Sequence, residues 1–371
     1  MKILHIISSG GMYGAEAVIL NLSRTLNENS HRSVLGVFSN SANPNLQLHE
    51  AAIGEGIESN VIPCNGQIDW TVAGNIRRLA AQTGADVVHA HGYKADVYVY
   101  FALRNTGIPF VSTCHNWLKG GPAVSFYGIV DRFVLRNYAG VIAVSDEVKA
   151  CLLRAGVRAD KVYSIQNGID LRPFVKARSS LLLEVKVATA LTVGWIGRLS
   201  NEKGADIFLR AAAQVLVQCP QARFVIVGDG PDLAMLRALV DELKIVKSIL
   251  FMGRRGDMPA VYASLDVMVS SSRQEGLPMA ILEGMASGLP LVATAVGDVP
   301  TVVLDGSAGI LVPSENVDLL ARGIIELLQS EDMRASYGAA SKKRVEDEFS
   351  AEKMTANYLV AYQQALVARE K

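Results

Sequence analysis

The stretch KILHIISSGGMYGAEAVILNLSRTLNE, residues 2–28, carries the pattern that decides the fold. Residues 2–7 form a short apolar run that is typical of a buried strand, and residues 14–28 place apolar side chains at helical spacing. The loop between them contains Gly10 and Gly11, whose conformational freedom permits a tight turn. The stretch therefore predicts a strand, a glycine turn and a helix in succession.

The same alternation continues along all 371 residues, and it predicts parallel sheets that helices cover on both faces. The runs that we interpret as further buried strands are residues 33–38, 86–91, 109–115, 140–145, 191–197, 223–230, 249–253, 266–272 and 289–295. Between residues 167 and 190 the pattern pauses at turn signals and a proline, which indicates a linker. The residues after Phe349 are predicted to form one amphipathic helix. The fold class is therefore α/β, with two Rossmann-like doubly wound domains.

Composition excludes several classes of protein. Lys+Arg and Asp+Glu both number 36, so the formal net charge is zero and nothing calls for a nucleic-acid partner. The 4 cysteines form no C-x-x-C pair, which favours a reducing cytoplasm over a disulfide framework. The first residues do not resemble a signal peptide, and no apolar run reaches the roughly 18 residues of a transmembrane helix. We expect a cytoplasmic protein, with peripheral contact to the inner face of a membrane left open.

Ligands of such sheets bind outside the carboxyl ends of the strands, so the loops after the strands are the candidate sites. The loop with Gly10 and Gly11 could bring backbone N–H groups and a helix N-terminus to a phosphate, or could be only a tight turn. It does not match G-x-G-x-x-G, and the next strand ends without an acidic residue, so a nicotinamide cofactor is disfavoured.

The loop GRLSNEKG contains Arg198 and Lys203 between a predicted strand and helix. A planar guanidinium and a compact ammonium suit a diphosphate, although both residues could equally be solvated surface cations.

The later stretch SSRQEGLPMAILEGMASGLP, residues 271–290, contains Glu275 and Glu283. In one continuous helix these carboxylates would be offset by about 80°, so the helix is expected to begin near Pro278, with Glu275 on the preceding loop. Glu283 could accept two hydrogen bonds from a ribose diol, or could lie on an exposed helical edge.

Three of the histidines on predicted strands are candidates for a role in the site or its surroundings. His115 ends one strand and could donate a hydrogen bond to a ligand, or could be structural. His89 and His91 share one face of another strand, and we interpret them as packing or rim residues. No nearby Asp, Glu or Cys completes a metal-binding set, so we expect no metal site.

Taken in order, these motifs resemble the retaining glycosyltransferases of family 4, which have the GT-B fold. The segments that carry the resemblance span nearly the whole chain, and they are SSGGMYGAE, CHN, NGID, GRLSNEKG, EGLPMAILE and MASGLPLVAT. The resemblance implies two domains that face each other across a cleft, with the last helix crossing back to the first domain. The domains are then expected at residues 1–168 with 349–371, for the acceptor, and at 191–348, for the donor, joined by a linker at 169–190.

The resemblance also implies roles for individual residues. The cations Arg198 and Lys203 would hold the donor diphosphate together with the backbone of Gly276, Leu277 and Pro278. Glu275 would bind the donor sugar and Glu283 the ribose. The remaining implied contacts are His115 beside the sugar, Gly10 and Gly11 under the phosphates, and Arg254, in FMGRR, at the border of the base.

The expected reaction moves a sugar from a nucleoside-diphosphate sugar, with uridine or guanosine favoured, to a hydroxyl of a carbohydrate or lipid-linked acceptor. We expect retention of the anomeric configuration and a role in cell-surface polysaccharide or glycolipid synthesis. The chain contains no Asp-x-Asp, so cations and a helix N-terminus are expected to replace a metal, and no cofactor is expected. The alternatives are a sugar-nucleotide epimerase of the same fold and a non-catalytic sugar-nucleotide binder.

Overall fold

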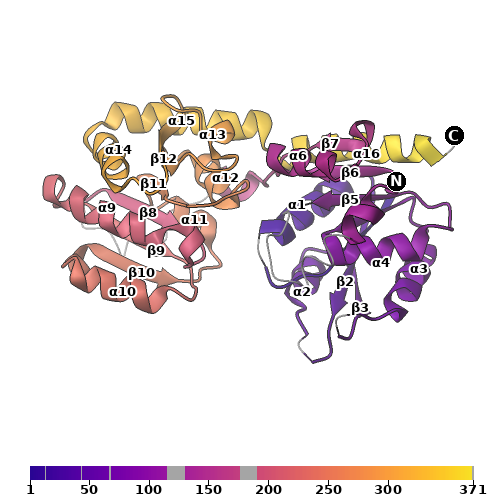
Figure 1. Cartoon of the computed structure of the whole chain (residues 1–371). Coiled ribbons are helices and arrows are strands. Elements are labelled where there is room, and N and C mark those ends of the chain that lie inside the picture. The colour runs from indigo at the N-terminus through magenta and orange to yellow at the C-terminus, as the bar shows by residue number, and fades with distance from the viewer. Residues whose placement is uncertain (13, 43, 67, 115–129, 176–189, 370–371) are drawn as a thin grey trace. The chain divides into compact units, whose positions relative to one another are not determined.

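A computed structural model describes residues 1–369 except 13, 43, 67, 115–129 and 176–189 (Figure 1). The chain forms two compact units. One unit combines Met1–Gly168 with Ala351–Lys371, and the other is Ile169–Ser350. Each unit contains one parallel sheet, as the alternating sequence predicts.

The first unit is built on a 7-stranded parallel sheet in the order β3-β2-β1-β4-β5-β6-β7. Its strands are β1 (Lys2–Ile7), β2 (Arg32–Ser39), β3 (Glu58–Pro63), β4 (Val87–His91), β5 (Phe110–Cys114), β6 (Gly140–Ala143) and β7 (Val162–Ser164). Its helices are α1 (Gly14–Glu28), α2 (Gln47–Gly54), α3 (Thr71–Thr83), α4 (Tyr93–Leu103), α6 (Asp146–Arg154) and α16 (Ala351–Arg369), with a 3₁₀ turn at Ala159–Lys161.

Side chains alternate between the two faces of this sheet, so each face has its own apolar core. On β1, Leu4 and Ile6 join the core under α3 and α4, whereas Ile7 joins Ile19 and Leu20 of α1. The doubly wound arrangement follows from strands that are apolar on both sides.

The second unit has a 6-stranded sheet in the order β10-β9-β8-β11-β12-β13. Its strands are β8 (Thr192–Ile196), β9 (Arg223–Val227), β10 (Ile249–Gly253), β11 (Val267–Ser270), β12 (Leu291–Thr294) and β13 (Gly309–Val312). Its helices are α7 (Arg172–Val175), α9 (Ala205–Gln218), α10 (Leu233–Glu242), α11 (Met258–Tyr262), α12 (Met279–Ala286), α13 (Val299–Val302), α14 (Val317–Gln329) and α15 (Glu331–Glu348), with 3₁₀ turns at Asn201–Lys203 and Val246–Ser248.

Both sheets reverse their strand order at one point, and such a switch point is where doubly wound sheets open a crevice for ligands. In the first sheet the reversal lies between β1 and β4, and in the second it lies between β8 and β11. The loops that leave β8 and β11 are therefore side by side, and they contain GRLSNEKG and SSRQEGLP.

The borders between the units differ slightly from the sequence expectation. Residues 169–175, expected in a linker, and Phe349 and Ser350, expected in the first domain, all belong to the second unit. The Ile169 N–H donates to the Phe349 carbonyl at 2.9 Å, and both side chains are buried in the same core. The rest of the expected linker, residues 176–189, lies outside the described residues.

The helix expected after Phe349 is α16, and it belongs to the first unit. Its buried side chains recur every three or four residues, which confirms the amphipathic pattern. They are Ala351, Met354, Thr355, Tyr358, Ala361, Tyr362 and Ala365. None of the described helices is long and apolar enough to span a membrane.

Candidate functional site

The switch point of the second sheet brings Lys203 and Glu275 into contact. The Lys203 Nζ lies 2.6 Å and 2.7 Å from the two carboxylate oxygens of Glu275. The Ser272 hydroxyl donates to Glu275 Oε1 at 2.6 Å. The Glu275 side chain is only 7% exposed, whereas that of Lys203 is 29% exposed. The ammonium is therefore fixed by a sheltered carboxylate and still accessible to a ligand.

Close approach of the two loops places this pair. Gly204 follows Lys203 with a φ of +66°, and a Cβ added there would lie 2.0 Å from the Ser271 carbonyl oxygen. The Ser271 hydroxyl donates back to the Gly204 carbonyl at 2.6 Å. Glycine is thus required where the two loops meet.

The second glutamate lies on a helix, as expected. Helix α12 begins at Met279 after Pro278, which leaves Glu275 on the preceding loop. The Tyr262 hydroxyl donates to Glu283 Oε2 at 2.8 Å, and Tyr262 is fully buried. Burial raises the pKa of Glu283, although the Tyr262 hydrogen bond opposes this shift. The carboxylate is therefore buried, and among the described residues Tyr262 is its hydrogen-bond donor.

The other residues nominated in the second unit have different surroundings. Arg198 and Arg254 are exposed, and neither guanidinium forms a hydrogen bond or ion pair within the described residues. Gly276 is exposed with open space on its side-chain face, while Leu277 and Pro278 are buried at the start of α12. The arrangement leaves two cations and a loop backbone open to an anionic ligand.

The first unit contributes the remaining nominated residues. Gly10 is exposed, and Gly11 has a φ of 153° that favours glycine. The Ser9 hydroxyl bonds to the Gly11 carbonyl and to Glu16 Oε1, both at 2.9 Å, which holds the loop against the start of α1. His115 lies outside the described residues.

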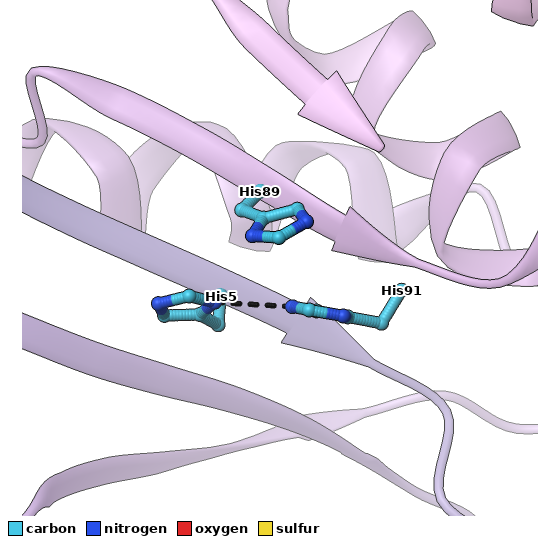
Figure 2. A group of neighbouring side chains, drawn as sticks. All are labelled: His5, His89 and His91. Atoms are coloured by element: carbon cyan, nitrogen blue, oxygen red, sulfur yellow. Dashed lines mark hydrogen bonds between the residues drawn. The ribbon is translucent and has the colours of Figure 1, made fainter. Parts of the chain in front are cut away.

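One cluster was missed by sequence reasoning. His5, His89 and His91 are buried together, with one potential ligand nitrogen from each within 4.8 Å of the others (Figure 2). His5 is the register partner of His89 on the neighbouring strand, and this pairing between distant strands is not visible in the sequence. The packing role expected for His89 and His91 is correct, but the sequence did not indicate that a third histidine joins them.

Hydrogen bonds account for much of this cluster. His5 Nδ1 and His91 Nε2 are 3.0 Å apart and share one hydrogen bond. The ring nitrogens of His89 lie 2.8 Å from the hydroxyls of Tyr362 and Thr113. The Tyr362 contact ties α16 to β4, so the cluster helps to dock the last helix on the first sheet.

Sequence reasoning also missed Ser272 and Tyr262, the partners of the two glutamates. Ser272 lies within the polar run that precedes Glu275, so its proximity could have been noticed. Tyr262 is 21 residues before Glu283, and only the packing of α11 against α12 brings them together.

Both halves of the chain match known families. Residues 12–172 match the family described as Glycosyltransferase Family 4, and residues 190–330 match Glycosyl transferases group 1. The chain is 30% identical over 342 residues to D-inositol 3-phosphate glycosyltransferase of Mycobacterium marinum, covering 84% of this chain and 70% of that protein. It is 28% identical to phosphatidyl-myo-inositol mannosyltransferase of Mycolicibacterium smegmatis, with 90% and 85% covered.

Solved structures share the fold. HepE from Anabaena, in complex with UDP, superposes with a TM-score of 0.83 at 24% identity, over 97% of this chain and 99% of that one. A glycosyltransferase from Rickettsia africae gives a TM-score of 0.84 at 20% identity, with 98% of each chain covered. These likenesses and the two Rossmann-like units confirm the expected GT-B fold. The chain therefore belongs to the group 1 glycosyltransferases of family 4.

Proposed function

We propose that this glycosyltransferase takes its sugar from a nucleoside-diphosphate sugar and transfers it to a hydroxyl group with retention of the anomeric configuration. The observation that carries the proposal is the Lys203–Glu275 ion pair at the switch point of the second sheet. A diphosphate needs an accessible ammonium, and a sugar needs a fixed carboxylate to accept its hydroxyl protons. This pair offers both within one contact.

In the proposed complex, Lys203 and Arg198 bind the diphosphate, and backbone N–H groups at Gly276, Leu277 and the start of α12 add to its stabilisation. Glu275 accepts hydrogen bonds from the sugar, and Glu283 accepts them from the ribose. Arg254 borders the base. His115, Gly10 and Gly11 keep the roles that the resemblance implies, beside the sugar and under the phosphates.

The chemistry follows from where charge develops. The bond between the anomeric carbon and the β-phosphate oxygen breaks, and a bond from the acceptor oxygen forms on the same face. The acceptor proton passes to the departing phosphate oxygen, so the nucleoside diphosphate leaves with it. Cations already in place stabilise the negative charge on that oxygen, and loss of one such donor typically costs about 10²- to 10³-fold in rate.

The relatives support the classes of donor and acceptor. The HepE structure contains UDP, which supports a uridine diphosphate sugar, with guanosine diphosphate as the other favoured donor. The mycobacterial relatives are named for an inositol phosphate and a phosphatidylinositol acceptor. We therefore propose a polyol, carbohydrate or lipid-linked hydroxyl as acceptor, in the synthesis of cell-surface polysaccharide or glycolipid.

A thermal-shift screen against UDP- and GDP-sugars tests the donor. A ligand at 100 times its Kd raises the free energy of unfolding by about 2.7 kcal/mol, so the true donor should raise Tm clearly. Incubation of that donor without an acceptor then separates transfer from epimerisation, because an epimerase needs no acceptor. If no sugar nucleotide raises Tm, the proposed donor class is wrong.

The stereochemistry is tested by NMR of the product as it first forms. Retention predicts that the new glycosidic bond has the anomeric configuration of the donor. An inverted centre in the first product would contradict the proposed same-face transfer.

A further inference from the structure

Arg273 belongs to the loop after β11 that carries Glu275, and both its backbone and its side chain bond to the loop after β8 that carries Lys203. The Arg273 N–H donates to the Glu202 carbonyl at 2.8 Å, and the Gln274 N–H reaches the same oxygen at 3.3 Å. The guanidinium Nη1 donates to the Asn201 carbonyl at 2.7 Å. These bonds fix the residues immediately before Lys203 against the residues immediately before Glu275.

The guanidinium is itself fixed by two carboxylates. Arg273 Nη1 and Nη2 each lie 2.8 Å from an oxygen of Asp206, which forms a bidentate pair in the first turn of α9. Arg273 Nε donates to Glu315, which lies just before α14 and has a φ of +64°. One planar cation thus links the loops after β8 and β11 to two further points of the second unit.

Electrostatics agree with this geometry. Burial acts to raise the pKa of Asp206, but the Arg273 hydrogen bonds and charge outweigh it, and the pKa lies below its usual value. The Arg273 side chain is 21% exposed and that of Asp206 is 24% exposed, so the pair is sheltered from solvent. A sheltered, bidentate pair holds its geometry better than an exposed ion pair does.

We propose that Arg273 is a positioning residue for the donor diphosphate, because it sets the loop of Lys203 relative to the loop of Glu275. This inference rests on the proposed function of that site. Within the described residues, the hydrogen bonds of Arg273 go to Asn201, Glu202, Asp206 and Glu315 and not to Lys203 or Glu275, so it acts through the backbone of the two loops. Displacement of a reacting group by about 1 Å can cost about 10²-fold in rate, so loss of the guanidinium should be felt in turnover.

The test compares binding of UDP with binding of uridine, and of GDP with guanosine, by calorimetry or ligand-observed NMR. Arg273→Ala is expected to weaken binding of the diphosphate about tenfold and to leave binding of the nucleoside, which depends on Glu283, within about twofold. The turnover of the sugar nucleotide found in the thermal-shift screen should fall about 100-fold. Arg273→Lys should rescue little, because a lysine cannot form the planar bidentate contact.

The matched control is Arg334→Ala. Arg334 also donates to carbonyls of the second unit, those of Leu327 and Leu328, but it links α15 to α14 and no site loop. It should leave the ratio of diphosphate to nucleoside affinity unchanged. If Arg273→Ala fails to fold, Asp206→Asn removes the charge pair with little change of shape and should show the same selective loss.

Each outcome has one meaning. If the wild type binds neither UDP nor GDP, the proposed function fails before the variants are considered. If the wild type binds a diphosphate and Arg273→Ala weakens diphosphate and nucleoside equally, Arg273 is only structural and the inference is wrong. Full activity of Arg273→Lys would also overturn it, since a charge without the planar geometry would then suffice.

Discussion

Glu283 is a carboxylate whose burial opposes folding, and the proposed contact with ribose would give it a function. Its carboxylate lies within the apolar run of α12, where burial raises its pKa and makes ionisation costly. The hydrogen bond that it receives from Tyr262, the one found within the part of the chain that the structure describes, leaves further acceptor capacity on the carboxylate. Two ribose hydroxyls could use that capacity.

Glu283→Gln should therefore separate stability from binding. The folded-state pKa of Glu283 lies above its unfolded value, so ionisation favours unfolding as the pH rises through the folded pKa. A neutral side chain of the same shape should raise the Tm of the ligand-free protein at pH 8 while weakening the binding of UDP or GDP. Melting curves at pH 5 and pH 8, with and without nucleotide, measure both effects. Weaker stability with unchanged nucleotide affinity would argue for a purely structural role.

Glu275→Gln should lower turnover and leave nucleotide binding nearly unchanged, in contrast to Glu283→Gln. The amide oxygen can still accept a hydrogen bond from Lys203, so the ammonium stays in place and nucleotide binding should change little, while the charge that faces the sugar is lost. A hydrogen bond to a charged group contributes about 1.5–3 kcal/mol, which corresponds to a fall in kcat of about 10- to 100-fold. Steady-state kinetics with the identified donor measure this. A loss confined to nucleotide affinity would mean that the two glutamates exchange roles.

The sequence could suggest these glutamates because both lie in one short motif with a proline between them. It could not suggest the residues that fix them. Asp206 and Arg273 are 67 residues apart, and Lys203 and Glu275 are 72 apart, so only the pairing of β8 with β11 brings them together. Contacts of this kind depend on strand order, which alternation alone does not specify.

Among the elements, the loop between β8 and α9 has a strict local requirement for glycine. Gly204 combines a positive φ with a backbone oxygen where a Cβ would lie. Gly204→Ala should lower the free energy of unfolding by more than about 1 kcal/mol, because the two loops must move apart. Gly204→Ala should also lower turnover, because movement of this loop would displace Lys203, the preceding residue. Gly256→Ala is the matched control, since open space surrounds that position. Equal melting temperatures for the two variants would contradict the close approach.

The face of β1 and β4 under α16 should respond to acid. Burial lowers the pKa of His5 to about 3, below that of an unfolded histidine, so the unfolded chain gains a proton first as the pH falls. The stability that neutral His5 provides is complete above about pH 6.5 and is lost between that pH and about 3, by up to about 1.4 kcal/mol per pH unit.

Chemical denaturation between pH 7 and pH 4 measures this slope for the first unit. His5→Gln should make the dependence on pH shallower, whatever its effect on absolute stability. A substitution at half-buried His49, whose Nδ1 lies 2.9 Å from the Ser59 hydroxyl, is the control for a histidine outside the cluster. An unchanged slope in His5→Gln would show that other groups cause the acid response.

The central strands of both sheets could be predicted from sequence, whereas several edge strands could not. The strands that sequence reasoning missed are β3, β7 and β13, and each lies at an edge of its sheet. β3 contains exposed and half-buried residues in place of an apolar run, and β7 has only 3 residues. Edge strands bury less surface, so their sequences carry a weaker signal.

For the whole molecule, the absence of an Asp-x-Asp motif from the sequence predicts a reaction that needs no divalent metal. Turnover with the identified donor should be unchanged by EDTA, since in the proposed complex Arg198, Lys203 and the start of α12 supply the positive charge. Loss of activity in EDTA that Mg²⁺ or Mn²⁺ restores would contradict this. Elemental analysis of the purified protein is a useful companion, because the three histidines of the first unit offer nitrogens at a spacing that could hold an ion.

The two-domain α/β architecture was easier to predict from the sequence than the domain borders or the individual contacts. Alternating apolar runs and helices require parallel sheets in two layers of helix, and the glycine and glutamate motifs locate the loops that face a ligand. The exact borders were less predictable, because Phe349 packs into the core of the second unit although the helix that follows it belongs to the first. His115 remains a prediction.

The position of α16 has a consequence for synthesis on the ribosome. The second unit is one continuous segment and can fold as soon as Ser350 has emerged. Translation of the first unit begins earlier but ends later, because Tyr358 and Tyr362 must still be translated before they can pack against His89 of β4. Until then its nascent sheet exposes an apolar face that bears an imidazole, so truncation before α16 is expected to make this unit more prone to aggregation than the second.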